Sequence, residues 1–422
     1  MINTEILQKE KLCKGKGIFI LCLLVMCWTL GVAAIAAASD QSCRVDYTVT
    51  LKPDLDMAQV SIRLEDGAQL RWLDFHIKSD RFSDLEADGR LRIGGERAIW
   101  EPPDGPAVLN MTVKVNHQRK NGRYDALMTP DWAIFRGDDL IPTVKVQLVK
   151  GTNLQAKLHF VLPEGWTDVD TGWPRKADGS FTVDNQERLF DRPVGWMIAG
   201  KVVTRRDFIG GTEICVSAPV GFGFSRMEIL TFFNFIWREA ELAFGKMPRK
   251  LLVVGAGDPM WRGGLSAPNS FFLHADRAIV SKNSTSPVLH ELVHVVTHIQ
   301  GKMNDDWIAE GIAEFYSIEL IYRAGGMTEA RYQKVRNWLK RWSREVTTLR
   351  VEHSKGPVTA RALILFQDLD KEIRQLTKEK HTIDDVTREL MKQGRVSLDD
   401  LRRISEQLVA GKLGVFDTPL LK

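Results

Sequence analysis

Two histidines one helical turn apart, followed sixteen residues later by a glutamate, constrain this chain more than any other feature of its sequence. The run from His290 to His294 reads H-E-L-V-H and puts both imidazoles on one face of a helix, where both can reach a single ion. Glu310 lies in the run from Trp307 to Gly311 (W-I-A-E-G), which starts a second apolar helix. When the two helices pack side by side, Glu310 completes a set of two His ligands and one Glu ligand.

This ligand set leaves one coordination position open, which is typical of catalytic rather than structural zinc sites. Glu291 projects about 100° around the helix from His290, so its carboxylate stands beside the ion rather than on it. A base in that position can deprotonate a metal-bound water. Glu314, one turn after Glu310, is placed to orient a ligand imidazole. The pattern predicts a hydrolase with one Zn²⁺ ion; the alternative is a core helix whose histidines satisfy each other.

The arrangement resembles the gluzincins, the thermolysin-like zinc metallopeptidases. Within them it is most similar to the glycyl aminopeptidase family and its relatives, the membrane alanyl aminopeptidases and leukotriene hydrolase. Those families have W-x-x-E-G after the zinc helix, as in the run that contains Glu310. The run from Arg262 to Ser266 (R-G-G-L-S) stands where relatives have a G-G-L-E-H or G-x-M-E-N strand, and His353 to Gly356 (H-S-K-G) stands where they have Y-x-K-G. Residues 124–132 and 190–196 are similar to that family's N-terminal domain.

The resemblance implies a multi-domain fold, in which an N-terminal all-β sandwich precedes an α+β thermolysin-like metallopeptidase domain. It also implies hydrolysis of peptide bonds in a peptide or protein substrate, through a Glu-activated zinc-bound water. Its metal ligands would be His290, His294 and Glu310, and its base would be Glu291. A substrate backbone would pair with the strand formed by Gly263, Gly264, Leu265 and Ser266, where the glycines allow close approach.

Three departures from the family pattern bear on this prediction. The stretch between His294 and Glu310 is a few residues shorter than in those relatives, which a tighter turn can absorb. The Glu that binds a substrate's free amine in the aminopeptidases is replaced by Ser266, and Ala267 follows it, so the anionic clamp is missing. This favours cleavage inside a peptide, or a different head group, over strict aminopeptidase action. The tyrosine that donates to the oxyanion is replaced by His353, and we expect this histidine to donate instead; a surface histidine is the alternative.

Two other functions remain open at this stage. The loss of the amine-binding Glu also permits a zinc hydrolase of a non-peptide substrate. The second is a non-catalytic, exported binding or scaffold protein that has kept the fold. The intact motif from His290 to His294, together with Glu310, argues against this second function, because a site that no longer catalyses a reaction does not need to keep its metal ligands.

The N-terminus predicts export. Four lysines within the first sixteen residues precede the uncharged segment from Gly17 to Ala38, which ends in small residues. This order is typical of a secretory signal peptide, cleaved before Ser39. The alternative is an uncleaved membrane anchor, because 22 apolar residues can span a bilayer. We therefore expect a periplasmic or secreted protein, with membrane attachment only if residues 17–38 are retained.

Charge excludes nucleic acid as a partner. Removal of residues 1–38 takes away four lysines and two glutamates, which leaves 54 basic and 52 acidic residues and a net charge of +2. We find no basic block interleaved with aromatic residues. The mature chain has two cysteines, Cys43 and Cys215, in strand-like runs of a protein predicted to meet an oxidising compartment. We expect a disulfide between them.

About 384 mature residues suggest two domains, residues 39–216 and 217–422. The first has short alternating runs separated by turns, which is typical of a β-sandwich. In the second domain, the spacing of apolar residues becomes that of helices alternating with short buried strands. Its predicted helices are 226–244, 328–346, 358–376, 383–391 and 398–408, besides the two that carry the ligands, and its predicted strands are 250–254, 271–273 and 278–280.

Overall fold

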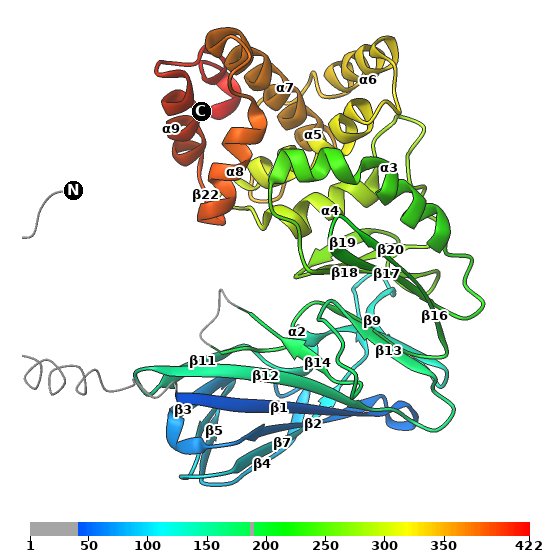
Figure 1. The fold of residues 1–422 in the computed structure, drawn as a ribbon, viewed down its shortest axis with the longest axis vertical. Helices are drawn as coiled ribbons and strands as arrows, with labels where there is room; N and C mark the ends of the chain where they lie inside the picture. The colour runs from blue at the N-terminus through cyan, green and yellow to red at the C-terminus, as the bar shows by residue number, and fades with distance from the viewer. Residues whose placement is uncertain (1–40, 186–189) are drawn as a thin grey trace, which may run out of the picture.

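A computed structural model of the protein describes residues 41–185 and 190–422. Strands dominate its N-terminal half and helices its C-terminal half, and a five-stranded sheet lies between them (Figure 1). The predicted signal peptide, residues 1–38, lies outside the described residues, so its cleavage and the export that it implies stay predictions. No helix in the described part of the chain is long and apolar enough to cross a membrane.

Two sheets share one hydrophobic core in the N-terminal half, with Tyr47, Phe75 and Trp100 among its largest side chains. Their strands alternate as the sequence predicts: in β2 (Met57–Leu64) every second residue from Ala58 onward is buried. The six-stranded sheet has the order β14 (Phe181–Val183), β12 (Thr152–Val161), β1 (Gln41–Lys52), β2, β7 (Ala107–Lys114) and β4 (Phe82–Ala87); the four-stranded sheet has the order β11 (Val144–Leu148), β3 (Leu70–His76), β6 (Arg97–Glu101) and β5 (Arg90–Gly94).

A third sheet connects this half to the rest of the molecule. Its inner face packs Trp132, Ile134 and Trp196 against Leu252 and Phe272 of the next sheet, so the two sheets share a small core of their own. This sheet has the order β13 (Asp168–Thr171), β15 (Trp196–Gly200), β10 (Trp132–Arg136), β9 (Tyr124–Met128) and β8 (His117–Gln118), and the short helix α2 (Gly137–Leu140) follows β10.

A fourth sheet, which like the third has five strands, positions the candidate site; this sheet alone is called the five-stranded sheet from here on. Its central strands β17, β18 and β20 are parallel, whereas β16 and β19 pair antiparallel at the two edges. The predicted domain boundary at 216/217 falls inside β17, so this sheet draws strands from both sides of it. The helix α3 (Arg226–Phe244) connects β17 to β18 and packs on β16 and β17. The order is β16 (Val202–Ile209), β17 (Thr212–Pro219), β18 (Lys250–Ala256), β20 (Ser270–His274) and β19 (Gly264–Ala267).

Helices complete the C-terminal half, and all those predicted are present. The prediction of a strand at 278–280 is wrong: this segment is irregular and bent between β20 and α4, where the hydroxyl of Ser286 donates to the carbonyl of Ile279. The remaining elements are α4 (Pro287–Thr297), β21 (Gln300–Gly301), α5 (Asp306–Arg323), α6 (Glu329–Trp342), α7 (Pro357–Thr377), α8 (Ile383–Gln393), β22 (Arg395–Val396), α9 (Leu398–Val409) and the 3₁₀ turns η1 (Pro53–Leu55), η2 (Gly67–Gln69), η3 (Gly414–Phe416) and η4 (Pro419–Leu421).

A buried ion pair ties the two halves together. Lys250 Nζ in β18 lies 2.6 Å from Asp170 Oδ1 in β13, and both side chains are fully buried. Asp170 also accepts a hydrogen bond from Arg206 at 3.2 Å. Removal of one member of such a pair leaves an uncompensated charge inside the protein, which typically destabilises a fold by about 3–5 kcal/mol.

The predicted disulfide between Cys43 and Cys215 is wrong. Both thiols are free and buried, and they belong to different hydrophobic cores: Cys43 lies in the core under β1, and Cys215 lies between β17 and the third sheet. Alternating burial accounts for the error, because a cysteine can serve as a small core residue in a strand of either half.

We expect the two thiols to be inert in the folded protein. Burial raises the pKa of Cys43, and burial together with the charge of Asp170 raises the pKa of Cys215 to about 12. The reactive thiolate is therefore scarce at pH 8. A chain that begins at Ser39 should incorporate no iodoacetamide when folded and two equivalents when unfolded without a reductant, as counted by mass spectrometry. Labelling that requires a reductant would contradict the free thiols.

Candidate active site

His290 and His294 lie on the face of helix α4 that points away from the core. Ser286 caps its first turn by accepting a hydrogen bond from the backbone N–H of Leu289, and Pro287 occupies the first helical position. Most of the helix is apolar and buried, so the two histidines share the face that remains open. The helix ends at Thr297, and the short stretch that follows turns the chain back into α5.

The helix α5 brings Glu310 to the same point. Trp307 is fully buried and anchors the first turn of this helix. Gly311 faces α7, where an added Cβ would lie 2.7 Å from Ala362 Cβ and 2.8 Å from Phe366. A larger residue at this position would push α7 away from α5. Packing therefore accounts for both ends of the W-x-x-E-G pattern: Trp307 fills the core, and Gly311 leaves room for α7.

His290, His294 and Glu310 form the single group of three potential metal ligands found among the described residues. We call these three residues the ligand triangle. The two Nε2 atoms are 3.2 Å apart, His290 Nε2 lies 3.4 Å from Glu310 Oε2, and His294 Nε2 lies 3.4 Å from Glu310 Oε1. A tetrahedral zinc ion with bonds of about 2.0–2.1 Å requires its ligand atoms to be about 3.3–3.4 Å apart. The shorter linker between the helices therefore still delivers Glu310, and these residues fit the ion.

The charges around this triangle favour a cation. Burial opposes charge on His290, but its contacts with Glu310 and Glu314 outweigh burial and raise the pKa of His290 well above its ordinary value. Burial raises the pKa of Glu310, yet its hydrogen bonds to His290 and His294 reverse this and lower the pKa strongly. Glu314 Oε2 lies 3.0 Å from His290 Nδ1 and leaves Nε2 facing the triangle, as predicted for an orienting carboxylate.

Glu291 points toward the edge strand β19. Burial raises the pKa of this carboxylic acid, while the charges of His290 and His294 act in the opposite direction. An added Cβ on Gly264 would lie 2.5 Å from Glu291 Oε1, so only a glycine leaves room for this carboxylate. The carboxylate therefore stands between the ligand triangle and the strand, where a proton acceptor for hydrolysis belongs.

The strand β19, predicted to bind substrate, is half-exposed and forms the edge of its sheet. Sequence reasoning missed the residues that hold it. Trp196 Nε1 of the third sheet donates to the carbonyl of Leu265 at 2.8 Å, and the backbone N–H of His274 donates to the carbonyl of Gly263 at 3.0 Å. The segment 190–196 carried a family resemblance, but nothing in its composition predicted this contact.

The structure does not bring His353 to the ligand triangle. Its imidazole is 83% exposed, and the contact observed for it is with Glu352, at 3.9 Å. The backbone N–H of Ser354 donates to Asp306 at 2.7 Å, which fixes this loop to the first turn of α5. An oxyanion donor must lie about 2.7–3.1 Å from the developing charge in a site that excludes water, and His353 does not meet that condition here.

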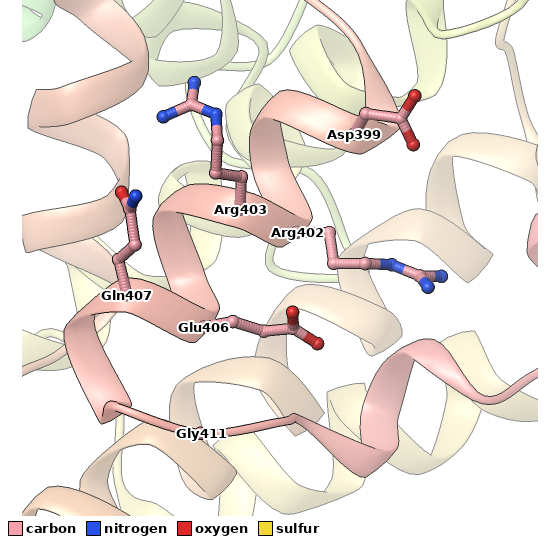
Figure 2. A pocket seen from close by; sticks show the side chains of 6 residues that line it. All are labelled: Asp399, Arg402, Arg403, Glu406, Gln407 and Gly411. Atoms are coloured by element: carbon pink, nitrogen blue, oxygen red, sulfur yellow. The ribbon is translucent and has the colours of Figure 1, made fainter.

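The structure also contains a shallow hollow elsewhere. This hollow has a volume of about 420 Å³ and lies on α9, and none of the candidate site residues lines it. Figure 2 shows the residues that line it. Its lining residues are Asp399, Arg402, Arg403, Glu406, Gln407 and Gly411.

Comparison with known proteins supports a mixed α/β, multi-domain fold like that of the M1 aminopeptidases. No family model and no curated protein matches the sequence. Among solved structures, an aminopeptidase N family protein from Idiomarina loihiensis is 18% identical, with a TM-score of 0.63 over 83% of this chain and 70% of that one. A mutant of the M1 zinc metallopeptidase from Deinococcus radiodurans is 14% identical, with a TM-score of 0.54 over 90% of this chain and 92% of that one. At these identities the likeness concerns the fold alone.

We expect Gly264→Ala to reduce hydrolysis while leaving metal content unchanged. The new methyl group must displace Glu291, and a misplacement of about 1 Å can cost on the order of 100-fold in rate. The measurement is kcat/KM beside zinc content by atomic absorption. Gly94→Ala is the control, because an added Cβ there meets nothing within 4 Å. A loss of metal in Gly264→Ala would contradict the assignment of this glycine to the base rather than to the ligands.

We expect His353→Ala to change kcat by less than about threefold, because its exposed imidazole lies outside the water-excluded site that an oxyanion donor requires. Steady-state kinetics on a peptide substrate tests this. A loss of more than about 100-fold with normal zinc content would show that the loop moves onto the site when substrate binds, and would restore the role predicted from the sequence.

Proposed function

We propose that this protein is an exported, zinc-dependent metallopeptidase. The observation that carries the proposal is the ligand triangle of His290, His294 and Glu310, whose nitrogen and carboxylate oxygen atoms approach one another to 3.2–3.4 Å, near the spacing that a tetrahedral ion with one open position requires. The fold shared with zinc metallopeptidases supports it independently. Export is supported by the sequence of residues 1–38.

The proposed reaction is peptide hydrolysis with Glu291 as general base and then general acid. When bound, a zinc ion supplies Lewis acidity, which polarises a carbonyl oxygen and makes water easier to deprotonate. Glu291 takes the proton of the attacking water and delivers it to the nitrogen of the leaving amine. Glu314 orients His290 through its Nδ1 atom, so that Nε2 stays available as a ligand.

The strand β19 would hold the substrate. Its free edge can accept an extended peptide as an added strand, and Gly264 brings that peptide close to Glu291. Ser266 and Ala267 provide no carboxylate for a free amine, which favours cleavage inside a peptide. The same absence supports a second candidate, a zinc hydrolase of a non-peptide substrate.

We expect Glu291→Gln to lower peptide cleavage by at least about 1,000-fold and to leave bound zinc unchanged, because the amide keeps the shape of the side chain but cannot accept the proton. Purified protein and variant are incubated with a diverse peptide library, with and without a chelator, and cleavage positions are mapped by mass spectrometry.

Glu389→Gln, a substitution at a half-exposed position on α8, is the control and should cut like the parent. Cuts inside peptides with blocked ends indicate an endopeptidase, whereas cuts confined to free N-termini indicate an aminopeptidase. Full activity in Glu291→Gln would refute the mechanism. No cleavage by a zinc-loaded parent protein would favour the non-peptide substrate.

A further inference from the structure

A cluster of arginines lies where the chain enters β19, and neither the ligand triangle nor Glu291 accounts for it. We call Arg119, Arg123 and Arg262 the arginine cluster. Arg123 and Arg262 both pair with Asp258, and Arg262 also lies 3.9 Å from Asp276. The guanidinium of Arg119 stacks on the ring of Trp261 at 4.1 Å. Backbone hydrogen bonds from Tyr124 to Pro259 and from Trp261 to Tyr124 hold the two segments together.

The cluster carries more positive charge than its partners neutralise. Three segments meet here: the β8–β9 hairpin, the loop before β19 and the turn after β20. Arg119, Lys120, Arg123, Arg262 and Arg277 supply five positive charges, against three negative charges from Asp125, Asp258 and Asp276. The carboxylate of Glu291 lies beside Gly264, further along the strand. A substrate with its own carboxylate would therefore be attracted to the arginine end of the strand.

The arginines keep hydrogen-bond donors available. Arg119 uses only its Nε–H, toward Asp125 at 3.1 Å, and Arg123 uses only one terminal nitrogen, toward Asp258, in the hydrogen bonds formed among the described residues. A guanidinium has five N–H donors. The side chain of Arg123 is one-third exposed and that of Arg262 half-exposed, so both can reach a ligand. An incoming carboxylate could bind without breaking the existing ion pairs.

The arginine cluster lies only a short distance, measured along a bound peptide, from the bond that would be cut. The Cα atoms of Arg262 and Gly264 are at most about 7.6 Å apart, because two trans peptide units separate them. A Cβ on Gly264 would touch Glu291, so Gly264 marks the position of the chemistry. An extended peptide covers about 3.3 Å per residue. The arginine cluster is therefore within about three residues of the bond that would be cut.

We propose that the arginine cluster binds a carboxylate of the substrate, within three residues of the scissile bond. The inference rests on the proposed peptidase function and names its substrate class: peptides that carry an acidic side chain or a free C-terminal carboxylate at this position. It also accounts for a strand with no acidic clamp at Ser266, because the charge that the site recognises is negative rather than positive.

The test compares matched peptides. One series replaces Glu by Gln at each of three positions on either side of a scissile bond, and a second compares a free C-terminal carboxylate with its amide. The parent protein should prefer the charged member of one series about tenfold in kcat/KM, because charge-assisted bonds from arginine to carboxylate are strong. Preference in the first series identifies a side chain as the ligand; preference in the second identifies the chain terminus.

Substitutions in the arginine cluster test whether the preference for charged peptides depends on it. Arg123→Gln and Arg262→Gln should each lower the ratio of kcat/KM for charged over neutral peptide about tenfold, and Arg262→Lys should lower it less, because lysine keeps the charge but not the bidentate geometry. Thermal melts confirm that each variant folds. Arg344→Gln, at a 76%-exposed position after α6, is the control and should keep the parent ratio. A parent that cuts both members equally, or variants that keep its preference, would overturn the inference and leave the peptidase proposal intact.

A binding measurement separates the two proposals if no peptide is cut. Calorimetry with the zinc-loaded Glu291→Gln variant compares the affinities of the Glu and Gln peptides directly. Tighter binding of the charged peptide, lost when Arg262→Gln is added, would support the arginine cluster although peptide hydrolysis had failed. Equal binding of both peptides would overturn the inference.

Discussion

The packing of α4 against α5 is the interaction on which the candidate site depends. The ligand atoms come from two different helices, so their spacing of 3.2–3.4 Å exists only at one separation of those helices. Gly311 supports α5 from the opposite side, because it lets α7 pack closely against this helix. Electrostatics acts in the same direction: Glu310 and Glu314 raise the pKa of His290, and the two histidines lower the pKa of Glu310, so this group of side chains favours positive charge between them.

A second constraint comes from the half of the molecule that contributes no metal ligand. The indole of Trp196 fixes the carbonyl of Leu265, and the β8–β9 hairpin holds the loop that leads into β19. The position of Gly264 beside Glu291 is thus determined from the N-terminal side. Catalytic geometry here is a property of both halves, connected by a buried ion pair between Asp170 and Lys250.

Sequence reasoning succeeded where a local pattern contains the whole answer. The spacing of His290, His294 and Glu310 predicted their meeting, and alternating burial predicted the strands of the N-terminal half. It failed where the answer depends on distant packing. Cys43 and Cys215 sit in strands of separate cores, and the exposure of His353 depends on a loop tied to α5 through Asp306. The position 216/217 falls inside β17, which pairs with β18, a contact that periodicity does not reveal.

The shared core between the third sheet and the five-stranded sheet also has a consequence for synthesis. Trp132, Ile134 and Trp196 leave the ribosome before Leu252 and Phe272, the residues that cover them. Until β18 and β20 emerge, the completed N-terminal half presents an apolar face, and the carboxylate of Asp170 lacks its buried partner Lys250. Such partly made surfaces are where aggregation begins and where chaperones bind. The nascent chain is therefore most vulnerable during the interval of seventy residues between Gly200 and Ser270, where β20 begins.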